Sequence, residues 1–289
     1  MTAELMKGSP LSKRIRGEVK ERIAQLQEEY GRVPGLAIVR AGEDPASVWY
    51  ANSLKKAATK VGINAQILAL PESIPQEEFE RELEALNRDP DIHGIILQEP
   101  YPDHIDADRI VSLLNPDKDV DGVHPLNAGY HFLGAPRFIP ATPLGGLLLL
   151  EEYGVPIKGA EAVVVGRSNI VGKPMALLLL SRHATVTVCH SRTRDLGEVT
   201  RRADILCVAV GKPGIITGDM IKPGATVVDF GTNPVGDELK GDVDFESAVE
   251  VAGKITPVPG GTGPVTTAVL LRNVLNAFEK TLGLPLTGA

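Results

Sequence analysis

The sequence contains little cysteine and few aromatic residues. Of its 289 residues only 4% are aromatic, and the two cysteines, Cys189 and Cys207, lie inside apolar stretches without a Cys-x-x-Cys spacing. This pattern disfavours both a disulfide framework and a zinc site. We therefore expect a protein of the reducing cytoplasm that has no metal centre.

Long hydrophobic runs are also missing, and acidic residues outnumber basic ones. Apolar runs such as MALLLL (175–180) are much shorter than the ~20 residues that cross a bilayer, and the start MTAELMKGSPLSKR has no apolar core of a signal peptide. The 30 basic and 37 acidic residues give a net charge of −7. This balance argues against a nucleic-acid or membrane partner. The composition is otherwise that of a globular protein of about two domains.

The first half of the chain alternates segments of helical and of strand-like pattern. Apolar residues recur at helical spacing in some segments, and short apolar runs that end near Gly or Pro form the others. The order β-α-β-α-β predicts a parallel sheet covered by helices. The expected strands are residues 35–42, 64–70 and 94–100, and the expected helices are residues 11–30, 46–61 and 75–89.

A second α/β series follows a loop-rich bridge at residues 115–146. The chain is thus predicted to form two α/β domains with the bridge as their boundary. The expected strands of this series are residues 161–166, 184–190, 204–211, 225–231 and 254–261, and the expected helices are residues 173–182 and 265–283.

The segment VVVGRSNIVGKP (163–174) passes from a strand through a glycine-rich turn into a helix. The free N–H groups and the dipole at such a helix start favour an anion such as a phosphate. The spacing from Gly166 to Gly172 is not the G-x-G-x-x-G fingerprint, however. An ordinary strand-to-helix turn that needs glycine for its backbone angles therefore remains open.

The end of the next strand indicates which nucleotide is bound. NAD sites usually place an acid there to bind the ribose hydroxyls, but the sequence here is HSRTR (190–194) and has no acid. Hydroxyl and guanidinium groups at this place suit a 2′-phosphate, and Arg167 adds a further cation. NADP is therefore favoured over NAD, with a solvated basic loop as the alternative.

Polar residues in the first half gather at strand ends and in the adjoining loops. Ser47 and Tyr50 lie on the helix after the first strand, Gln98 ends an apolar strand, and Asp121 lies in PDKDVDGVHP. Each alone is more often a cap, a turn or a surface residue. Their joint position at the ligand-binding edge of a parallel sheet favours one shared cleft.

Seven stretches together resemble the methylenetetrahydrofolate dehydrogenase/methenyltetrahydrofolate cyclohydrolase family. They occur in family order over nearly the whole chain, and PDKDVDG and GRSNIVGKP are the most specific. The stretches are EDPASVWYANS (43–53), GIILQEPYP (94–102), NPDKDVDGVHP (115–125), PATPLGG (140–146), VVVGRSNIVGKP (163–174), TVCHSRT (187–193) and TPVPGGTGPVT (256–266).

The resemblance implies a fold, a substrate class and an assembly. It implies an N-terminal three-layer α/β catalytic domain (1–138) and a Rossmann-type NADP-binding domain (139–264), with a C-terminal helix (265–289) that returns to the first domain. It further implies tetrahydrofolate derivatives as substrates, NADP as cofactor and a homodimer. The family works in the one-carbon metabolism that feeds purine biosynthesis.

The resemblance also implies roles for individual residues. Asp121 would hold the amino-pyrimidine edge of the pteridine, while Tyr50 and Gln98 would surround the reacting one-carbon unit beside Ser47. These are the expected catalytic and substrate-binding residues. Backbone at Gly260, Gly261 and Gly263 would approach the substrate and the nicotinamide, and the NADP site would be lined by Gly166, Arg167, Ser168, Ser191, Arg192 and Thr232.

One departure from the family pattern bears on activity. The family carries a catalytic lysine four residues after the tyrosine, whereas Leu54 stands there in this chain, followed by Lys55 and Lys56. Those two lysines lie ~100° and more around the helix and do not simply substitute. Hydride transfer needs mainly orientation, but hydrolysis of the methenyl product needs a positioned acid–base group. We therefore expect dehydrogenase activity with weak or absent cyclohydrolase activity.

Smaller departures are Glu99 after Gln98, Ala141 in place of a usual Cys, and Thr262 within PGGTGP. Two other functions stay open. One is another two-domain NADP dehydrogenase, although the expected cleft lacks an obvious Lys–Asp or His–Asp pair for a carbonyl substrate. The other is a folate- or nucleotide-binding regulatory protein that has lost catalysis, which only Leu54 favours.

Overall fold

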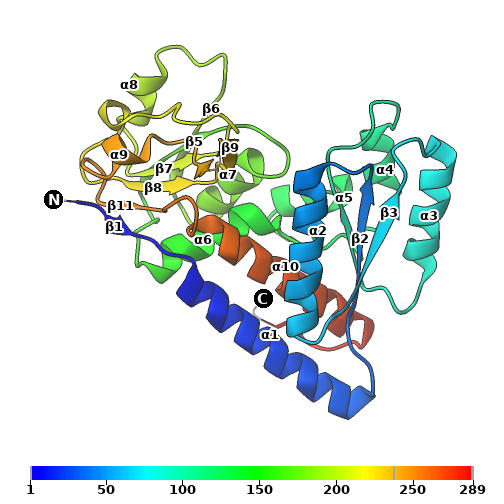
Figure 1. Ribbon diagram of the computed structural model, residues 1–289. Coiled ribbons are helices and arrows are strands. Elements are labelled where there is room, and N and C mark those ends of the chain that lie inside the picture. The colour runs from blue at the N-terminus through cyan, green and yellow to red at the C-terminus, as the bar shows by residue number, and fades with distance from the viewer. Residues whose placement is uncertain (1, 237, 288–289) are drawn as a thin grey trace. The chain divides into compact units, whose positions relative to one another are not determined.

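The computed structural model describes residues 2–236 and 238–287, which form two compact units. Unit 1 contains the described residues up to Lys13 together with Pro140–Val269, and unit 2 contains Arg14–Ile139 and the described chain from Leu270 onward. Two long helices, α1 (Ser9–Tyr30) and α10 (Thr262–Thr281), contribute residues to both units. Figure 1 labels the elements along the chain.

Unit 2 is built on a parallel three-stranded sheet in the order β3-β2-β4. Successive residues of the central strand β2 point to opposite faces of the sheet, and all seven are buried, as expected for a parallel strand covered on both sides. The elements are β2 (Gly35–Ala41), α2 (Pro45–Lys60), β3 (Asn64–Leu70), α3 (Gln76–Arg88), β4 (Gly94–Leu97), α4 (Ala107–Leu113) and α5 (Pro125–Phe132).

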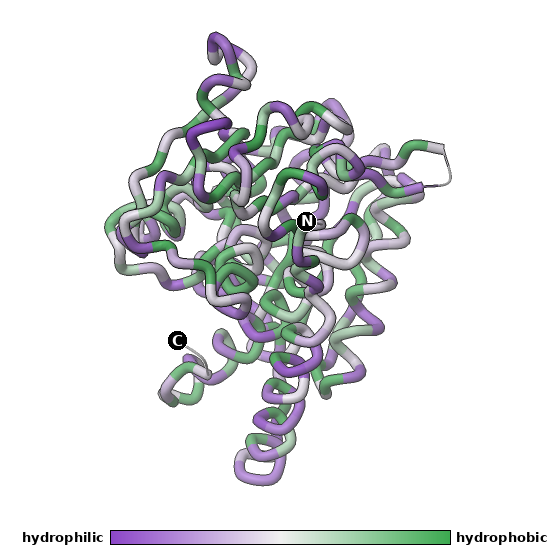
Figure 2. The backbone as a smooth tube through the Cα atoms, turned by 90° about the vertical axis from the view of Figure 1, so that its left-hand side faces the viewer, coloured by the Kyte–Doolittle hydropathy of each residue, from purple (hydrophilic) through white to green (hydrophobic). Residues whose placement is uncertain are grey.

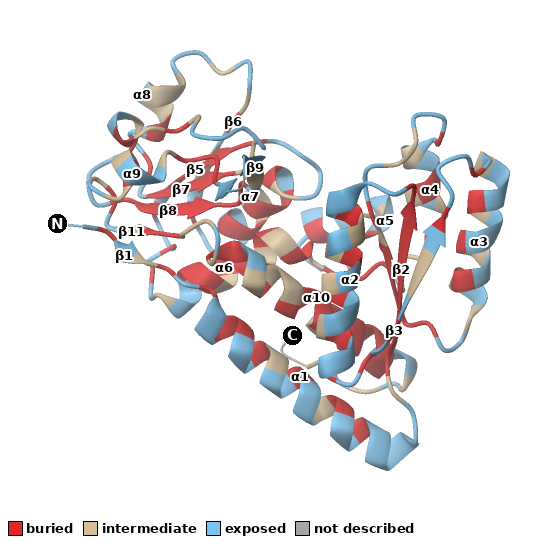
Figure 3. Cartoon of the chain, viewed as in Figure 1, coloured by how far each residue is buried: buried red, intermediate tan, exposed pale blue. Residues whose placement is uncertain are grey.

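Helix α3 covers one face of this sheet. Its apolar residues Phe79, Leu83 and Leu86 fall at helical spacing, and they join Ala37 and Val39 of β2 in one buried cluster. The buried strand and the half-buried, half-exposed helix are distinct in Figure 3. The cluster holds β2 rigidly, so the polar residues that follow the strands are fixed in position.

The C-terminal half of α10 packs within unit 2. The amide of Asn273 donates to the carbonyls of Val120 (2.8 Å) and Ile139 (3.3 Å). The buried Glu279 accepts a hydrogen bond from Arg22 at 2.8 Å. The predicted return of the C-terminal helix to the first α/β domain is therefore confirmed.

Unit 1 contains a six-stranded parallel sheet in the order β1-β11-β8-β7-β5-β6. The chain crosses from β5 to β6 on one side and then to β7 on the other, so the order reverses at β5. In open α/β sheets ligands bind at the carboxyl ends of the strands beside such a reversal. The strands are β1 (Glu4–Leu5), β5 (Glu161–Val165), β6 (Thr185–Cys189), β7 (Ile205–Val208), β8 (Thr226–Asp229) and β11 (Lys254–Ile255).

The remaining elements of unit 1 cover the sheet or extend from it. Apolar side chains of β5, β7 and β8, among them Val163, Leu206 and Val227, form a buried cluster with residues of α9 and η1. The remaining elements are α6 (Ala141–Glu152), α7 (Gly172–Ser181), α8 (Leu196–Thr200), η1 (Gly218–Met220), the hairpin β9 (Asn233–Val235) and β10 (Glu238–Lys240), and α9 (Phe245–Ala248).

The two-domain α/β architecture and the parallel sheets expected from the sequence are confirmed, but two segments differ. The bridge at 115–146 was expected to be loop-rich, yet it holds α5 and the start of α6. Pro125 occupies the first turn of α5 and Pro140 immediately precedes α6, where a proline starts a helix instead of breaking it. Both prolines therefore start helices within the bridge.

The expected strand at 254–261 is also wrong beyond its first two residues. Only Lys254 and Ile255 pair with β8. Pro257 and Pro259 have no N–H to donate to a ladder, and Gly260 adopts a φ of +107°. The short partner strand β1 (Glu4–Leu5) was not predicted, since two residues carry no detectable alternation.

Hydrophilic and hydrophobic residues are interspersed along the tube in Figure 2. Within residues 2–236 and 238–287, no helix has the length and apolar character required to cross a bilayer.

Candidate functional site

The carboxyl ends of β2 and β4 carry the predicted residues of unit 2. Asp44 caps helix α2, and its side chain accepts a hydrogen bond from the Ser47 N–H at 2.8 Å. Gln98 follows β4 directly, and its N–H donates to the Val39 carbonyl at 2.9 Å, which ties it to the central strand. Ser47 and Gln98 are both buried. Both residues are thus held by backbone contacts at one edge of the sheet.

The Gln98 side chain is buried but incompletely satisfied. Its Oε1 atom has no hydrogen-bond partner among the residues that the structure describes. A buried amide oxygen without a donor costs about 1–3 kcal/mol, so a site that retains one is poised to accept a bond from a ligand.

Two aspartates of the loop after the β4 region have opposite surroundings. Asp119 is fully buried and accepts hydrogen bonds from the Val123 N–H (3.1 Å), the His124 N–H (2.8 Å) and the Asn127 amide (2.8 Å). Asp121, two residues later and half-buried, accepts no hydrogen bond from the described part of the chain. Asp119 therefore shapes the loop, and the carboxylate of Asp121 remains available.

The charge of Asp121 interacts with those of nearby acids and with two tyrosines. Burial, together with the charges of Asp119 and Glu99, raises the pKa of Asp121 to about 7. Burial also raises the pKa of Tyr50 and of Tyr101, and the charge of Asp121 adds to both shifts. The side chains of Tyr50 and Tyr101 therefore lie within range of the Asp121 charge.

Helix α2 presents Leu54 on its buried face. Leu54 is 2% exposed and shares this face with Ser47, Ala51 and Ala58. Tyr50 precedes it by four residues, so the two side chains lie on the same side of the helix one turn apart. Lys55 and Lys56 are exposed, as expected for positions around the helix from Leu54, and the remaining lysine of this helix, Lys60, is exposed too.

Tyr101 and Asp119 are residues of this region that sequence reasoning missed. The Tyr101 ring packs edge-on against Phe79 of the core at a centroid distance of 6.2 Å. With Glu99 and Asp103 it lines a hollow of about 550 Å³. Its place three residues after Gln98, in the same quoted stretch GIILQEPYP, was the available signal.

In unit 1 the glycine-rich turn joins β5 to α7 at the point where the strand order reverses. Gly166 has a φ of +130°, and a Cβ there would lie 2.1 Å from the Ala209 carbonyl oxygen. A Cβ on Gly172 would lie 2.3 Å from the Gly166 carbonyl oxygen, so both positions require glycine. The Ser168 hydroxyl accepts hydrogen bonds from the N–H groups of Val171 and Gly172, each at 3.2 Å.

The other predicted cofactor residues lie at the same carboxyl edge of the sheet. Arg167 and Ser168 are exposed in the turn after β5, Ser191 and Arg192 are exposed after β6, and Thr232 is exposed after β8. Local hydrogen bonds fix the turn of residues 190–193: the Thr193 N–H donates to the His190 carbonyl at 2.8 Å, and the Arg192 N–H donates to the side-chain Nδ1 of His190 at 3.1 Å. The Arg192 guanidinium has no hydrogen bond or ion pair among residues 2–236 and 238–287, so it is available to a ligand.

The three glycines around the start of α10 are of two kinds. Gly260 and Gly263 have open space where a side chain would begin. A Cβ on Gly261 would instead lie 2.7 Å from the Pro257 carbonyl oxygen, and the backbone of Gly261 abuts Gly8. The glycine at 261 is thus required by packing inside unit 1.

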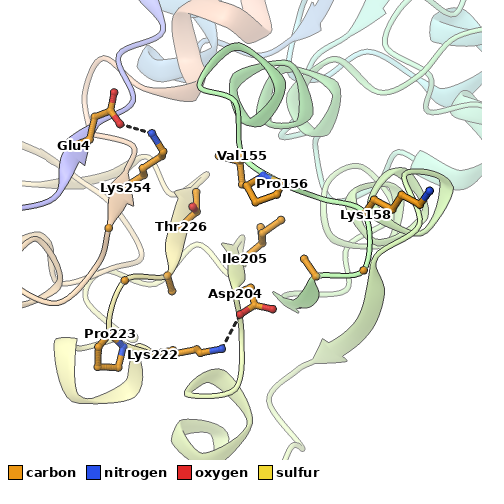
Figure 4. Close-up of a pocket in the computed structure, with 15 residues that line it drawn as sticks. Glu4, Val155, Pro156, Lys158, Asp204, Ile205, Lys222, Pro223, Thr226 and Lys254 are labelled. Atoms are coloured by element: carbon orange, nitrogen blue, oxygen red, sulfur yellow. Dashed lines mark hydrogen bonds and ion pairs between the residues drawn. The ribbon is translucent and has the colours of Figure 1, made fainter.

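A separate hollow of about 560 Å³ lies at the opposite, amino edge of the unit 1 sheet (Figure 4). Two ion pairs span its wall, Lys222 with Asp204 at 2.6 Å and Lys254 with Glu4. None of the predicted site residues lines it. The cofactor residues therefore occupy the edge of the sheet that the strand-order rule favours.

Two family models match the chain. One describes the catalytic domain of tetrahydrofolate dehydrogenase/cyclohydrolase and matches residues 6–121, and the other describes the NAD(P)-binding domain of the same family and matches residues 140–282. Both of the regions described above fall largely within these matches.

Individual proteins resemble the chain over its whole length. The bifunctional protein FolD of Bordetella avium is 54% identical over 283 residues, which is 98% of this chain and 99% of the relative. The structure of the bifunctional FolD enzyme from Campylobacter jejuni has a TM-score of 0.94 at 43% identity and covers 96% of this chain and 99% of its own. The Trypanosoma brucei FolD structure, complexed with NADP and an inhibitor, has a TM-score of 0.94 at 39% identity and covers 98% and 99%.

Proposed function

The chain belongs to the tetrahydrofolate dehydrogenase/cyclohydrolase family, and we propose that it oxidises 5,10-methylenetetrahydrofolate to 5,10-methenyltetrahydrofolate with NADP⁺. The family match covers both α/β domains, and the residues that the family uses for folate and dinucleotide are present apart from the lysine at position 54. The named activity of the similar bifunctional enzymes supports the same reaction.

The observation that carries the proposal is the half-buried, unpaired carboxylate of Asp121. A carboxylate can accept two N–H bonds from an amino-pyrimidine edge, and such charge-assisted bonds are strong in a partly desolvated place. Tyr50 and Tyr101 lie close enough to feel its charge. In this proposal Asp121 anchors the pterin, and the tyrosines with Gln98 surround the one-carbon unit.

The dinucleotide is proposed to bind at the carboxyl edge of the unit 1 sheet. When bound, NADP⁺ supplies the acceptor for the hydride that leaves the methylene carbon. The close backbone approach at Gly166 and Gly172 fits a ligand with a pyrophosphate, and the exposed Ser191 and Arg192 fit a 2′-phosphate. The NADP complex of the Trypanosoma brucei relative supports this choice of cofactor.

The second family reaction, hydrolysis of the methenyl product to 10-formyltetrahydrofolate, is proposed to be weak. Leu54 offers no proton-transfer group on the face that carries Tyr50, and Lys55 and Lys56 are exposed elsewhere on the helix. Loss of a positioned acid–base group costs ~10²–10⁴-fold in rate. Oxidation depends on orientation and is proposed to persist.

Further expectations belong to the same proposal. The domains extend over residues 1–138 and 139–264, the protein forms a homodimer, and it acts in the cytoplasm. Light scattering coupled to size exclusion tests the dimer, and a mass of one chain would contradict it.

A paired assay on the purified protein tests the function. One arm mixes the protein with 5,10-methylenetetrahydrofolate and NADP⁺ and follows formation of NADPH. The other arm supplies 5,10-methenyltetrahydrofolate and follows its hydrolysis. We expect clear oxidation and, per enzyme, hydrolysis at least ~10²-fold slower than in a relative that carries the lysine.

The possible outcomes separate the alternatives. Binding of both ligands without NADPH formation would favour a regulatory folate- and nucleotide-binding protein. NADPH formation only with a hydroxy acid or a cyclic alcohol would favour another two-domain dehydrogenase. Hydrolysis at a rate that matches the oxidation would refute the proposed role of Leu54.

A further inference from the structure

Two buried aspartates of unit 1 lie at the carboxyl edge of its sheet but were not among the expected site residues. Asp229 ends β8 and is 3% exposed, and Asp242 precedes α9 and is fully buried. Buried carboxylates are costly unless donors surround them. The donors to this pair show what it holds.

Asp242 collects N–H groups from the loop that follows β7. Its Oδ2 atom accepts from the N–H of Val210 (2.6 Å) and of Gly211 (3.0 Å), and its Oδ1 atom accepts from the N–H of Lys212 (2.8 Å). Three consecutive backbone donors therefore converge on one carboxylate. Oδ1 also accepts from the Asn233 amide at 2.8 Å.

Asp229 in turn holds the segment that contains Asp242. Its carboxylate accepts from the N–H groups of Gly231 (2.8 Å), Asp242 (3.0 Å) and Val243 (2.9 Å). A Cβ on Gly231 would lie 2.3 Å from the Asp242 nitrogen, and one on Gly241 would lie 1.9 Å from Asp229 Oδ2. Glycine at positions 231 and 241 therefore lets the backbone lie directly against the two aspartates, where a Cβ atom would collide with them.

The loops tied together in this way are the ones that border the cofactor residues. Gly166 abuts the Ala209 carbonyl, and Ala209 immediately precedes the three donors to Asp242. Asn233, the fourth donor, immediately follows Thr232. Two donors to Asp242 are therefore chain neighbours of the predicted cofactor site. Val210 follows Ala209, which Gly166 contacts, and Asn233 follows Thr232.

We propose that Asp242 is a positioning residue for the dinucleotide, which it orders by holding the loop after β7 and the Thr232 loop in one arrangement, with Asp229 as its support. This inference rests on the proposed function only for the identity of the ligand. Because the loops are already ordered before the ligand binds, binding does not carry the free-energy cost of ordering them.

The test measures binding of each substrate separately by calorimetry in the full-length protein. The Asp242→Asn variant replaces one carboxylate oxygen with an NH₂ group. Each oxygen of the wild-type carboxylate accepts two hydrogen bonds, so two of the four donors lose their acceptor. We expect the Kd for NADP⁺ to rise at least ~10-fold while the Kd for tetrahydrofolate changes less than ~2-fold. In turnover, the KM for NADP⁺ should rise more than kcat falls.

The matched control is Asp204→Asn, which removes an acid from the amino edge of the same sheet, where it pairs with Lys222. It should leave the affinity for NADP⁺ unchanged. If Asp242→Asn unfolds, Asn233→Ala gives the decisive measurement. It removes the amide that donates to Asp242 and to the Lys240 carbonyl (3.2 Å) but leaves the three backbone donors to Asp242 in place, and it should weaken NADP⁺ binding ~3-fold or more.

Equal weakening of both ligands by Asp242→Asn, or unchanged NADP⁺ affinity in Asn233→Ala, would overturn the positioning role. So would a wild-type protein that binds no dinucleotide. A wild-type protein that binds NADP⁺ but does not oxidise methylenetetrahydrofolate would refute the proposed function alone, since the binding comparison needs no turnover.

Discussion

Leu54 lies one helical turn after Tyr50 on α2, and its side chain is buried. The position that the family gives to a lysine therefore faces the same side as the tyrosine next to Asp121. The leucine offers no proton-transfer group on this face of the helix. This relationship leads to the first prediction.

Leu54→Lys should raise methenyltetrahydrofolate hydrolysis ~10²-fold or more and change the oxidation rate little, because it restores an acid–base group four residues after Tyr50. A lysine on a buried face should also destabilise the protein by about 2 kcal/mol. Parallel assays of both reactions and urea unfolding measure these effects. Leu54→Met is the matched control, since it alters packing without adding a titratable group. Equal hydrolysis by the two variants would contradict the prediction.

Asp121→Asn should stabilise the ligand-free protein at alkaline pH while it weakens folate binding. The folded-state pKa of about 7 exceeds the ordinary 3.8, so the folded protein retains this proton longer than the unfolded chain. The wild type thus loses stability as the pH rises from about 4 through about 7, and the variant does not. At pH 8 we expect a gain on the order of 2 kcal/mol.

Urea unfolding of wild type and Asp121→Asn at pH 5 and pH 8 measures this difference, and calorimetry should show a Kd for tetrahydrofolate raised at least ~10²-fold, as for loss of a charge-assisted contact. Asp103→Asn, at an exposed acid of the same unit, serves as control. A pH-independent stability difference would argue against the raised pKa.

Arg192→Ala should reduce the preference for NADP over NAD. The guanidinium is exposed, and the hydrogen bond of the Arg192 backbone to His190 does not depend on the side chain. Loss of one charged contact to a 2′-phosphate costs about 1.5–3 kcal/mol, so the KM for NADP⁺ should rise ~10–10²-fold while that for NAD⁺ stays unchanged. Steady-state kinetics with both cofactors test this, with Arg201→Ala, at the exposed residue that follows α8, as the control. A parallel rise for NAD⁺ would place Arg192 elsewhere in the site.

His93 should make unit 2 sensitive to acid. Its Nδ1 atom accepts from the Gly35 N–H at 2.9 Å, and its ring packs edge-on against Phe278. Burial, aided by the charges of Arg32 and Lys118, lowers its pKa from 6.5 to about 4. The unfolded chain therefore binds a proton first, and stability falls by up to about 3 kcal/mol as the pH drops from 6.5 to about 4.

His93→Asn keeps an acceptor for Gly35 but cannot titrate. Its unfolding free energy should depend less steeply on pH over this range than that of the wild type, at the expense of about 1–2 kcal/mol at neutral pH for the lost ring contact. Guanidinium unfolding at several pH values tests this. Identical slopes for the two proteins would exclude His93 as the source of acid sensitivity.

The sequence predicted the elements whose periodicity extends over several turns or a whole buried strand. Helices α2 and α3 and strands β2 and β3 occur within a residue or two of their expected bounds. The segments that the sequence predicted incorrectly depend on long-range partners or on residues that occur in both loops and helices. Strand β1 exists because it pairs with β11 some 250 residues later, and Pro125 looks the same in a loop as in a first helical turn.

The candidate site was predictable to the same degree. The sequence predicted Gln98 at a strand end, Tyr50 on the helix after a strand and Asp121 in a loop. The motif PDKDVDG does not reveal which of its aspartates accepts hydrogen bonds from the backbone. Tyr101 and Asp242 were missed for a related reason, since their importance lies in neighbours that are distant in the chain.

The division between Asp119 and Asp121 has a consequence for how variation at this loop would be read in a living cell. Substitutions at Asp119 strip three donors of their acceptor and should deplete the protein itself, whereas those at Asp121 should leave a plentiful but idle protein. Two acids separated by a single valine would thus score alike in a growth screen and differ completely in a blot for the protein.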